Sequence, residues 1–196
     1  MRKLTLVLDP AHGADVPGKC SPDGKHKEYR WSREACAKLE AKLKDKGFKV
    51  YYTTKATIEI GLTKRTIAAN VIKEDHKFLI SLHNNAAGDG TKWASARGYE
   101  VFTTPGVTSS DKYAEIVLKQ LIKDFPSLTL RADKADGDLD KEAKFTVIDK
   151  TNFPSILIEW LFQDNKDDVA LLEDLTTTDK FCDSIVKACE VIDSTL

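Results

Sequence analysis

The sequence has no long apolar run, no closely paired cysteines and almost no net charge. Every apolar stretch falls short of the roughly 20 residues that cross a bilayer, so we expect no membrane insertion. The 196 residues include 30 Lys and Arg against 31 Asp and Glu, a formal net charge of −1, which excludes overall attraction to nucleic acid. The four cysteines have no C-x-x-C spacing, which indicates reduced, mostly buried thiols.

The chain also lacks repeats, low-complexity segments and a recognisable linker, which predicts one domain over residues 1–196. The apolar stretch that follows Arg2 and Lys3 ends at Asp9, and is too short for a signal peptide. We therefore expect synthesis in the cytoplasm without a signal peptide, or secretion if a leader has been removed. A monomer is expected.

The first clear pattern is a strand over Leu4–Asp9, where every second residue is leucine and Thr5 and Val7 lie between the leucines. Pro10 cannot extend a ladder of hydrogen bonds, so the strand should end before it. His12 then follows the strand end and precedes a flexible Gly13. Loops after strands are where α/β proteins place reactive groups.

Strand and helix patterns alternate along the rest of the chain, which predicts an α/β fold with a mixed, mostly parallel central sheet flanked by helices on both faces. The polar segment 124–143 is interpreted as an exposed excursion. Further strands are expected at 48–53, 78–82, 98–103, 145–148 and 155–159. Helices are expected from an N-cap at Ser32 to Gly47, and at 62–73, 109–123, 166–175 and 179–194.

Three of the expected strands end in His12, His83 and Glu159. Because parallel strands bring their carboxyl ends to one edge of a sheet, these side chains can converge. Two histidines and a carboxylate are typical of a catalytic zinc site that leaves a fourth position for water. The candidates for the carboxylate are Asp9, Glu28, Glu34 and Glu159.

Glu159 is unusual because it lies between Ile158 and Trp160 in a strongly apolar run. A buried carboxylate is costly unless a cation or a proton neutralises it. Its pKa can then suit a general base, although a glutamate at a wet strand end is the alternative. Two other residues near the site are open to interpretation: Asp9 could orient His12, and His26 could be an outer-shell group or a competing ligand.

Several segments together resemble the zinc-dependent N-acetylmuramoyl-L-alanine amidases, the catalytic domain of bacterial autolysins and phage endolysins. The matching segments are Leu8–Gly13, Glu28, Ser81–Ala86, Arg97–Phe102 and Pro154–Asn165. The resemblance implies one zinc ion per chain, held by His12, Glu28 and His83, with Glu159 as the catalytic glutamate.

Asn84 and Asn85 can hydrogen-bond a peptide or a sugar, although asparagine is also common in turns. The matching segment Arg97–Phe102 makes Arg97 a further candidate for binding substrate. The chain departs from the family at Ala11 and Leu161, where the family usually has glycine. It also has Thr54 in place of an arginine. The two glycine replacements lie beside the expected site, so they bear on the fit of the substrate more than on metal binding.

The implied activity is hydrolysis of the amide between N-acetylmuramic acid and L-alanine in peptidoglycan by a zinc-activated water, which lyses the cell wall. Peptidoglycan is the expected partner, and the absence of wall-binding repeats favours a phage-type lysin released at lysis. Two alternatives remain: a zinc peptidase that cuts the stem peptide, and a non-catalytic wall-binding module. Product analysis separates the first alternative from an amidase, and a zinc titration tests the second.

Overall fold

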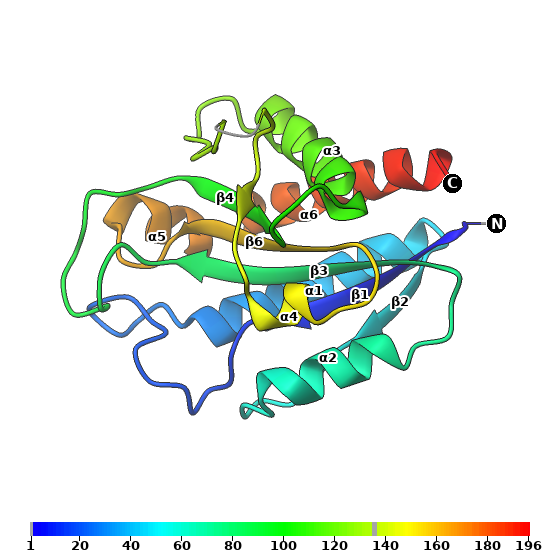
Figure 1. The fold of residues 1–196 in the computed structure, drawn as a ribbon. Coiled ribbons are helices and arrows are strands. Elements are labelled where there is room, and N and C mark those ends of the chain that lie inside the picture. Colours follow the sequence, from blue (N-terminus) through cyan, green and yellow to red (C-terminus); the bar gives the residue numbers. More distant parts are fainter. Residues whose placement is uncertain (1, 135–136) are drawn as a thin grey trace.

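The computed structural model describes residues 2–134 and 137–196, so part of the predicted excursion at 124–143 lies outside the described residues. A six-stranded sheet with the order β2-β1-β3-β6-β4-β5 forms its centre (Figure 1). Its strands are β1 (Leu4–Pro10), β2 (Lys49–Tyr52), β3 (His76–Asn85), β4 (Tyr99–Thr103), β5 (Lys141–Glu142) and β6 (Ser155–Phe162). Strands β2, β1, β3 and β6 are parallel, and β4 runs antiparallel to β6. The predicted mixed, mostly parallel sheet is confirmed.

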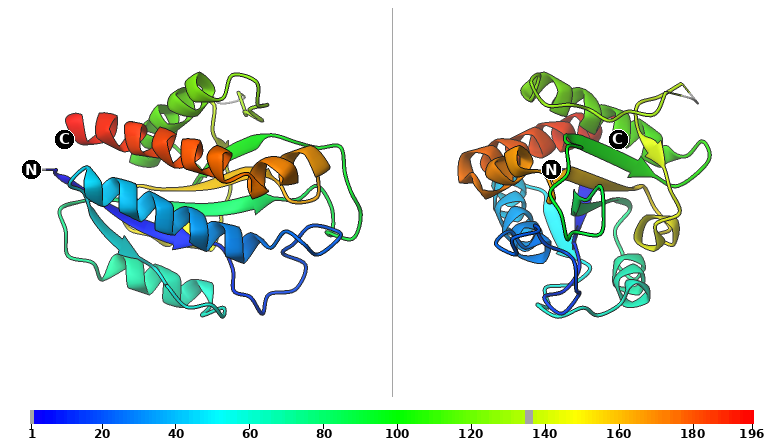
Figure 2. Two further views of the ribbon diagram at one scale, coloured as in Figure 1. Left: turned by 180° about the vertical axis from the view of Figure 1, so that it is seen from behind. Right: turned by 90° about the vertical axis from the view of Figure 1, so that its left-hand side faces the viewer.

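Helices cover both faces of this sheet, as predicted (Figure 2). They are α1 (Glu28–Asp45), α2 (Leu62–Asn70), α3 (Ser109–Asp124), α4 (Thr146–Asp149), α5 (Lys166–Glu173) and α6 (Leu175–Ser194). Helices α1, α3, α5 and α6 lie on one face, and α2 and α4 lie on the other. No helix of the described chain has the length and apolar character that a bilayer crossing requires.

The two faces differ in size and composition. Alternate strand residues such as Leu8, Ile80 and Ile158 point toward α1, α3 and α6 and form the main core, here called the large apolar face. The intervening residues form a smaller cluster with α2 and α4, here called the α2–α4 face. Leu79 and Leu157 belong to this second cluster, so one strand supplies both layers.

The first helix begins earlier than predicted. Helix α1 starts at Glu28, and Ser32 lies inside it instead of capping it. The Ser32 hydroxyl donates to the carbonyl of Leu82 (2.7 Å) and accepts from the amide of Ala11 (2.8 Å). Its side chain therefore ties α1 to β1 and β3, and is not available to the amides of a first turn.

The predicted strand at 145–148 is wrong. Thr146–Asp149 form the single helical turn α4, closed by a hydrogen bond from the Asp149 amide to the Phe145 carbonyl (2.8 Å). This turn buries Val147 and Ile148 against the sheet, which an apolar pattern of four residues cannot distinguish from a strand.

Several other boundaries also differ from the prediction. Helix α6 starts at Leu175, four residues before the predicted start, because the Asp174 carboxylate caps its first amides. Helix α2 ends at Asn70, and β6 continues to Phe162. Strand β3 continues to Asn85, so His83 lies within it and not just beyond it. Glu159 lies within β6 and not at its end.

Candidate metal centre

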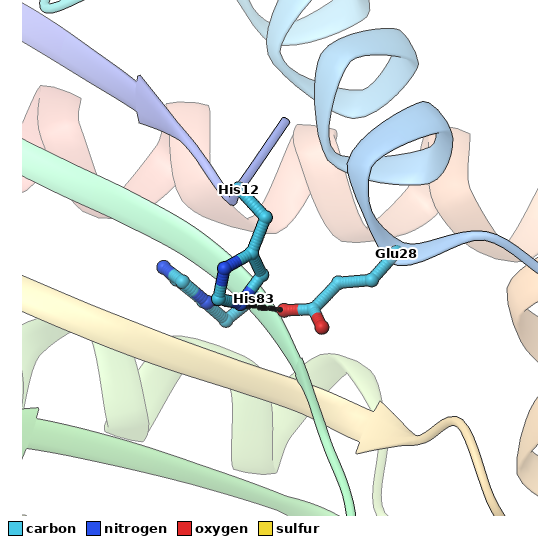
Figure 3. A group of neighbouring side chains, drawn as sticks. All are labelled: His12, Glu28 and His83. Carbon is cyan, nitrogen blue, oxygen red and sulfur yellow. Dashed lines mark hydrogen bonds and ion pairs between the residues drawn. The ribbon is translucent and has the colours of Figure 1, made fainter. Parts of the chain in front are cut away.

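His12, Glu28 and His83 converge from three elements: the turn after β1, the first residue of α1, and β3 (Figure 3). One ligand atom from each lies within 4.8 Å of the others. Among the described residues, these three form a group of histidine and acidic side chains that could hold a metal ion together. Glu34, another candidate for the carboxylate, is exposed on α1.

Glu28 is the centre of the group and is only 1% exposed. Its Oε1 lies 3.0 Å from Nδ1 of His83 and 3.4 Å from Nε2 of His12. Burial raises the pKa of Glu28, but the hydrogen bonds from His12 and His83 outweigh burial and lower the pKa well below its usual value. Glu28 is therefore a carboxylate at neutral pH, the form that binds metal.

The turn that carries His12 is held by arginine side chains that donate to its backbone. His12 has a φ of 45°, a conformation that is uncommon for residues with a side chain. Its carbonyl accepts hydrogen bonds from Nη2 of Arg33 (2.7 Å) and Nη2 of Arg65 (3.1 Å). At Gly13, a Cβ atom would lie 2.0 Å from the amide nitrogen of Glu59, so only glycine fits there.

Asp9, the predicted partner of His12, acts on the backbone of this turn and not on the imidazole ring. Its carboxylate accepts from Thr53, from Oγ of Ser81 (2.6 Å) and from Nη1 of Arg65 (3.0 Å). Arg65 in turn donates to the His12 carbonyl. Asp9 and Arg65 are both 1% exposed, so this buried ion pair fixes the turn indirectly.

A contact that the sequence did not reveal restrains the second oxygen of Glu28. Nε2 of Gln163 donates to Oε2 of Glu28 (3.2 Å), while the Asn84 amide donates to Oε1 (3.1 Å). Gln163 is 1% exposed and follows the end of β6. The only sequence signal was a polar side chain directly after an apolar strand.

Asn84 and His26 are used inside the protein. Asn84 is 3% exposed; it donates to the Trp160 carbonyl (2.8 Å), and its Oδ1 lies 2.9 Å from Nε2 of His26. The other ring nitrogen of His26 lies 2.7 Å from Glu173. These contacts take up the polar atoms of Asn84, which does not favour its predicted role in binding substrate. His26 lies outside the metal-binding group.

The other two candidates for binding substrate lie nearer the surface. Asn85 is partly buried, and its Oδ1 accepts from the Ala86 amide (2.8 Å). Arg97 is 43% exposed and forms ion pairs with Asp167 (3.2 Å) and Asp168 (3.5 Å). Their roles toward substrate stay predictions.

Glu159 lies beside the metal-binding group because it is the direct partner of His83 in the pairing of β3 with β6. Its Oε2 is buried and has no hydrogen-bond partner among the described residues. Burial raises the pKa of Glu159 to about 7, with the His83 charge opposing and the Glu28 charge adding to the shift. A carboxyl group with such a pKa can both accept and donate a proton near neutrality.

Leu161 shows the structural consequence of replacing the family's glycine. Its φ of 62° lies in the left-handed region, at an irregularity in the pairing of β3 with β6. Glycine adopts this conformation without strain, whereas Leu161 compensates with a side chain that is fully buried in the main core. Its side chain therefore packs away from the site.

A cavity of about 200 Å³ opens beside these residues on the α2–α4 face. His12, His83 and Glu159 line it together with two kinds of wall. The charged wall consists of Asp9, Lys19, Glu59 and Arg65. The apolar wall consists of Leu62, Phe145, Val147 and Leu157, joined by Thr146.

Comparisons with known proteins agree with this geometry. A family model described as N-acetylmuramoyl-L-alanine amidase matches residues 6–191. The N-acetylmuramoyl-L-alanine amidase AmiC of Neisseria meningitidis serogroup B is 28% identical over 210 residues, which cover 87% of this chain and 48% of the relative. The chain thus spans about half the length of that relative.

Solved structures share the fold over the whole chain. An N-acetylmuramoyl-L-alanine amidase from Clostridium difficile 630 has a TM-score of 0.85 and 25% identity, and the match covers 100% of both chains. The catalytic domain of CwlV, an N-acetylmuramoyl-L-alanine amidase from Bacillus (Paenibacillus) polymyxa var. colistinus, has a TM-score of 0.78 and 23% identity. That match covers 97% of this chain and 98% of the other.

Proposed function

Because the chain belongs to the N-acetylmuramoyl-L-alanine amidase family, we propose that it hydrolyses the amide between N-acetylmuramic acid and L-alanine in peptidoglycan, with one zinc ion held by His12, Glu28 and His83. The family and its relatives indicate peptidoglycan amidase activity. The observation that carries the zinc-dependent mechanism is the convergence of these three side chains directly beside Glu159.

The three side chains fit zinc in both number and chemistry. Two imidazole nitrogens and one carboxylate oxygen are a donor set of catalytic zinc sites, in which a fourth position stays open to water or substrate. Zinc in such a site polarises a carbonyl oxygen and lowers the pKa of a water molecule. The hydrogen bonds to both oxygens of Glu28 hold its carboxylate toward the two histidines.

Glu159 supplies the proton transfers. Its carboxylate accepts a proton from the water that attacks the scissile carbonyl carbon, and its carboxyl group then donates that proton to the amide nitrogen. The C–N bond breaks, leaving a carboxylate on muramic acid and a free amino group on L-alanine. The partial burial that raises the pKa of Glu159 suits it to both steps.

The test is digestion of purified peptidoglycan with the zinc-loaded protein, followed by mass spectrometry of the products. We expect stem peptides that begin with L-alanine, and glycan strands of unchanged length. Cuts within the stem peptide would instead identify a peptidase, and binding without cleavage would identify a wall-binding module. Falling turbidity of a suspension of cell walls would support a lytic role.

Replacing Glu159 with glutamine should lower turnover by roughly 10²- to 10⁴-fold, the usual contribution of one acid–base group. Zinc binding should persist because Glu159 is not one of the three ligands. The matched control is Glu34→Gln, the same change at an exposed position of α1. Full activity of Glu159→Gln would exclude Glu159 as the base, and loss of zinc would make it a ligand.

A further inference from the structure

A second cavity, of about 260 Å³, adjoins the catalytic cavity. The loop Ala14–Cys20 lines it together with Lys27 and Tyr29. Lys19 lines both cavities, so one side chain connects the second cavity to the space beside His12, His83 and Glu159. Nothing in the mechanism above uses this second cavity.

The backbone holds Lys19 and Lys27 at neighbouring positions. Cys20 and Lys27 form an antiparallel bridge, and the Glu28 amide donates to the Lys19 carbonyl (3.1 Å). Both lysines are partly buried and directly flank the start of α1, whose first residue is the proposed ligand Glu28. These backbone hydrogen bonds therefore fix the main chain of both lysines relative to the candidate metal centre.

Neither ammonium group has an ion pair or a hydrogen bond among the described residues. Lys25, in the same hairpin, lies 4.0 Å from Asp23. The one acidic side chain that lines the second cavity is Asp15, and its Oδ1 already accepts from the Glu59 amide (2.8 Å). Two like charges beside one small cavity repel each other, so an anion bound there would be stabilised by both.

Building on the proposed function, we propose that Lys19 and Lys27 form a subsite for a carboxylate of the peptidoglycan stem peptide. The carboxyl group of muramic acid is the acyl half of the scissile amide, and it therefore carries no charge in the substrate. The anionic groups near that bond thus belong to the peptide. A peptide that leaves the catalytic cavity past Lys19 brings its carboxylate into the second cavity.

The experiment compares two synthetic muropeptides that differ only in one group. In the first, the residue after L-alanine has a free carboxylate; in the second, that carboxylate is an amide. The measured quantity is the ratio of kcat/KM for the acid to kcat/KM for the amide. This ratio cancels any effect of Lys19 on the catalytic step itself, because that step is common to both peptides.

We expect wild type to prefer the acid, and Lys19→Met and Lys27→Met each to lower the ratio roughly fivefold, the effect of losing about 1 kcal/mol from a partly exposed ion pair. Lys19→Arg should restore the preference, and added salt should weaken it. The matched control, Lys25→Met, changes a lysine of the same hairpin and should leave the ratio unchanged.

Equal cleavage of both peptides by wild type, or an unchanged ratio in both methionine variants, would overturn the subsite while leaving the amidase activity established. Cleavage of neither peptide would instead overturn the proposed function. The binding of both peptides to Glu159→Gln, measured by calorimetry, gives the same comparison without turnover, and loss of the acid preference in Glu159→Gln/Lys27→Met supports the subsite.

Discussion

The two faces of the central sheet come from the same strands and serve different purposes. On the large apolar face, β1, β3 and β6 present Leu8, Leu82 and Ile158, all fully buried. One residue further along each strand, the α2–α4 face presents Asp9, His83 and Glu159. The alternation of side chains along a strand thus separates the stabilising core from the reactive groups by a single position.

This comparison explains why the site is rigid without being apolar. The reactive face is supported from behind by a close-packed core, so its strands cannot shift easily. Its own buried charges are paired, as shown by Asp9 with Arg65 and by Glu100 with Lys141 (3.1 Å). Glu159 is the exception, because one of its oxygens has no partner among the described residues.

The largest effect is expected from removing a histidine of the α2–α4 face, a change that leaves the main core intact. His12→Ala or His83→Ala should abolish stoichiometric zinc binding, because each removes one of three ligands. The fold should persist, since neither side chain belongs to the main core. Metal analysis after dialysis measures the zinc content, and circular dichroism checks the fold.

Zinc bound at one ion per chain by the double variant His12→Ala/His83→Ala would contradict the assignment. Loss of Glu28 should weaken binding less completely, because the carboxylate of Glu159, the direct strand partner of His83, can partly substitute as the third ligand. A Glu34→Ala variant on the exposed side of α1 is the control that keeps full zinc content.

The comparison of faces also explains which features were predictable from the sequence. The apolar alternation in Leu4–Asp9 and the run before Glu159 predicted strands, and parallel strands predicted convergence of His12 with His83. Helix α4 was missed because the short segment around Val147 is apolar in either conformation. Ser32 was misinterpreted because its hydroxyl bonds to a strand carbonyl from another part of the chain.

Long-range contacts also account for what sequence reasoning missed in the site. Gln163 reaches Glu28 across 135 positions of sequence, and no local pattern encodes that contact. Asn84 looked like a polar residue at a strand end, but the extension of β3 buries it against His26. Both outcomes depend on tertiary packing, whereas the resemblance of motifs pointed to the proposed ligands, which the structure brings within 4.8 Å of one another.

Removing the hydrogen bond from Gln163 tests whether a polar contact to Glu28 strengthens zinc binding. Gln163→Leu removes the donor to Oε2 of Glu28 but keeps a similar side-chain volume. We expect zinc affinity to fall by roughly 10- to 100-fold, the usual effect of losing a hydrogen bond to a metal ligand. Competition with a chromophoric chelator measures this affinity without any turnover.

The matched control is Gln120→Leu on α3, where the amide donates to Asp124 (2.7 Å), far along the sequence from the ligands. Its zinc affinity should equal that of wild type. A Gln163→Leu protein with unchanged zinc affinity would show that Gln163 contributes packing alone.

The smallest effect concerns a second buried acid, Asp140, which sharpens the comparison with Glu159. Asp140 is 2% exposed, and its Oδ2 accepts from Oγ1 of Thr103 (2.7 Å), on the side of β4 that contributes Val101 to the main core. Burial raises the pKa of Asp140 to about 6, with the charge of Asp138 adding to the shift. The cause is the same as for Glu159, but no reactive group lies beside it.

A raised pKa in the folded state means that the protonated form favours folding. The contribution of Asp140 to stability is therefore fully present below its unfolded value of 3.8, and is lost as the pH rises through about 6. Asp140→Asn stays neutral throughout, so its advantage over wild type should grow between about pH 4 and pH 6 and then level off.

Urea unfolding of wild type and Asp140→Asn at intervals from pH 4 to pH 8 measures this difference.

Asp174→Asn should give a stability difference of the opposite sign, because hydrogen bonds from Thr176 and Thr177 lower the pKa of Asp174 to about 2. The stability that Asp174 contributes is present above pH 4 and is lost as the pH falls through about 2. Turnover should be unchanged in Asp140→Asn, in contrast to Glu159→Gln, because the proposed mechanism uses only Glu159 for proton transfer. A stability difference for Asp140→Asn that stayed constant with pH would show that Asp140 ionises alike in the folded and unfolded chain.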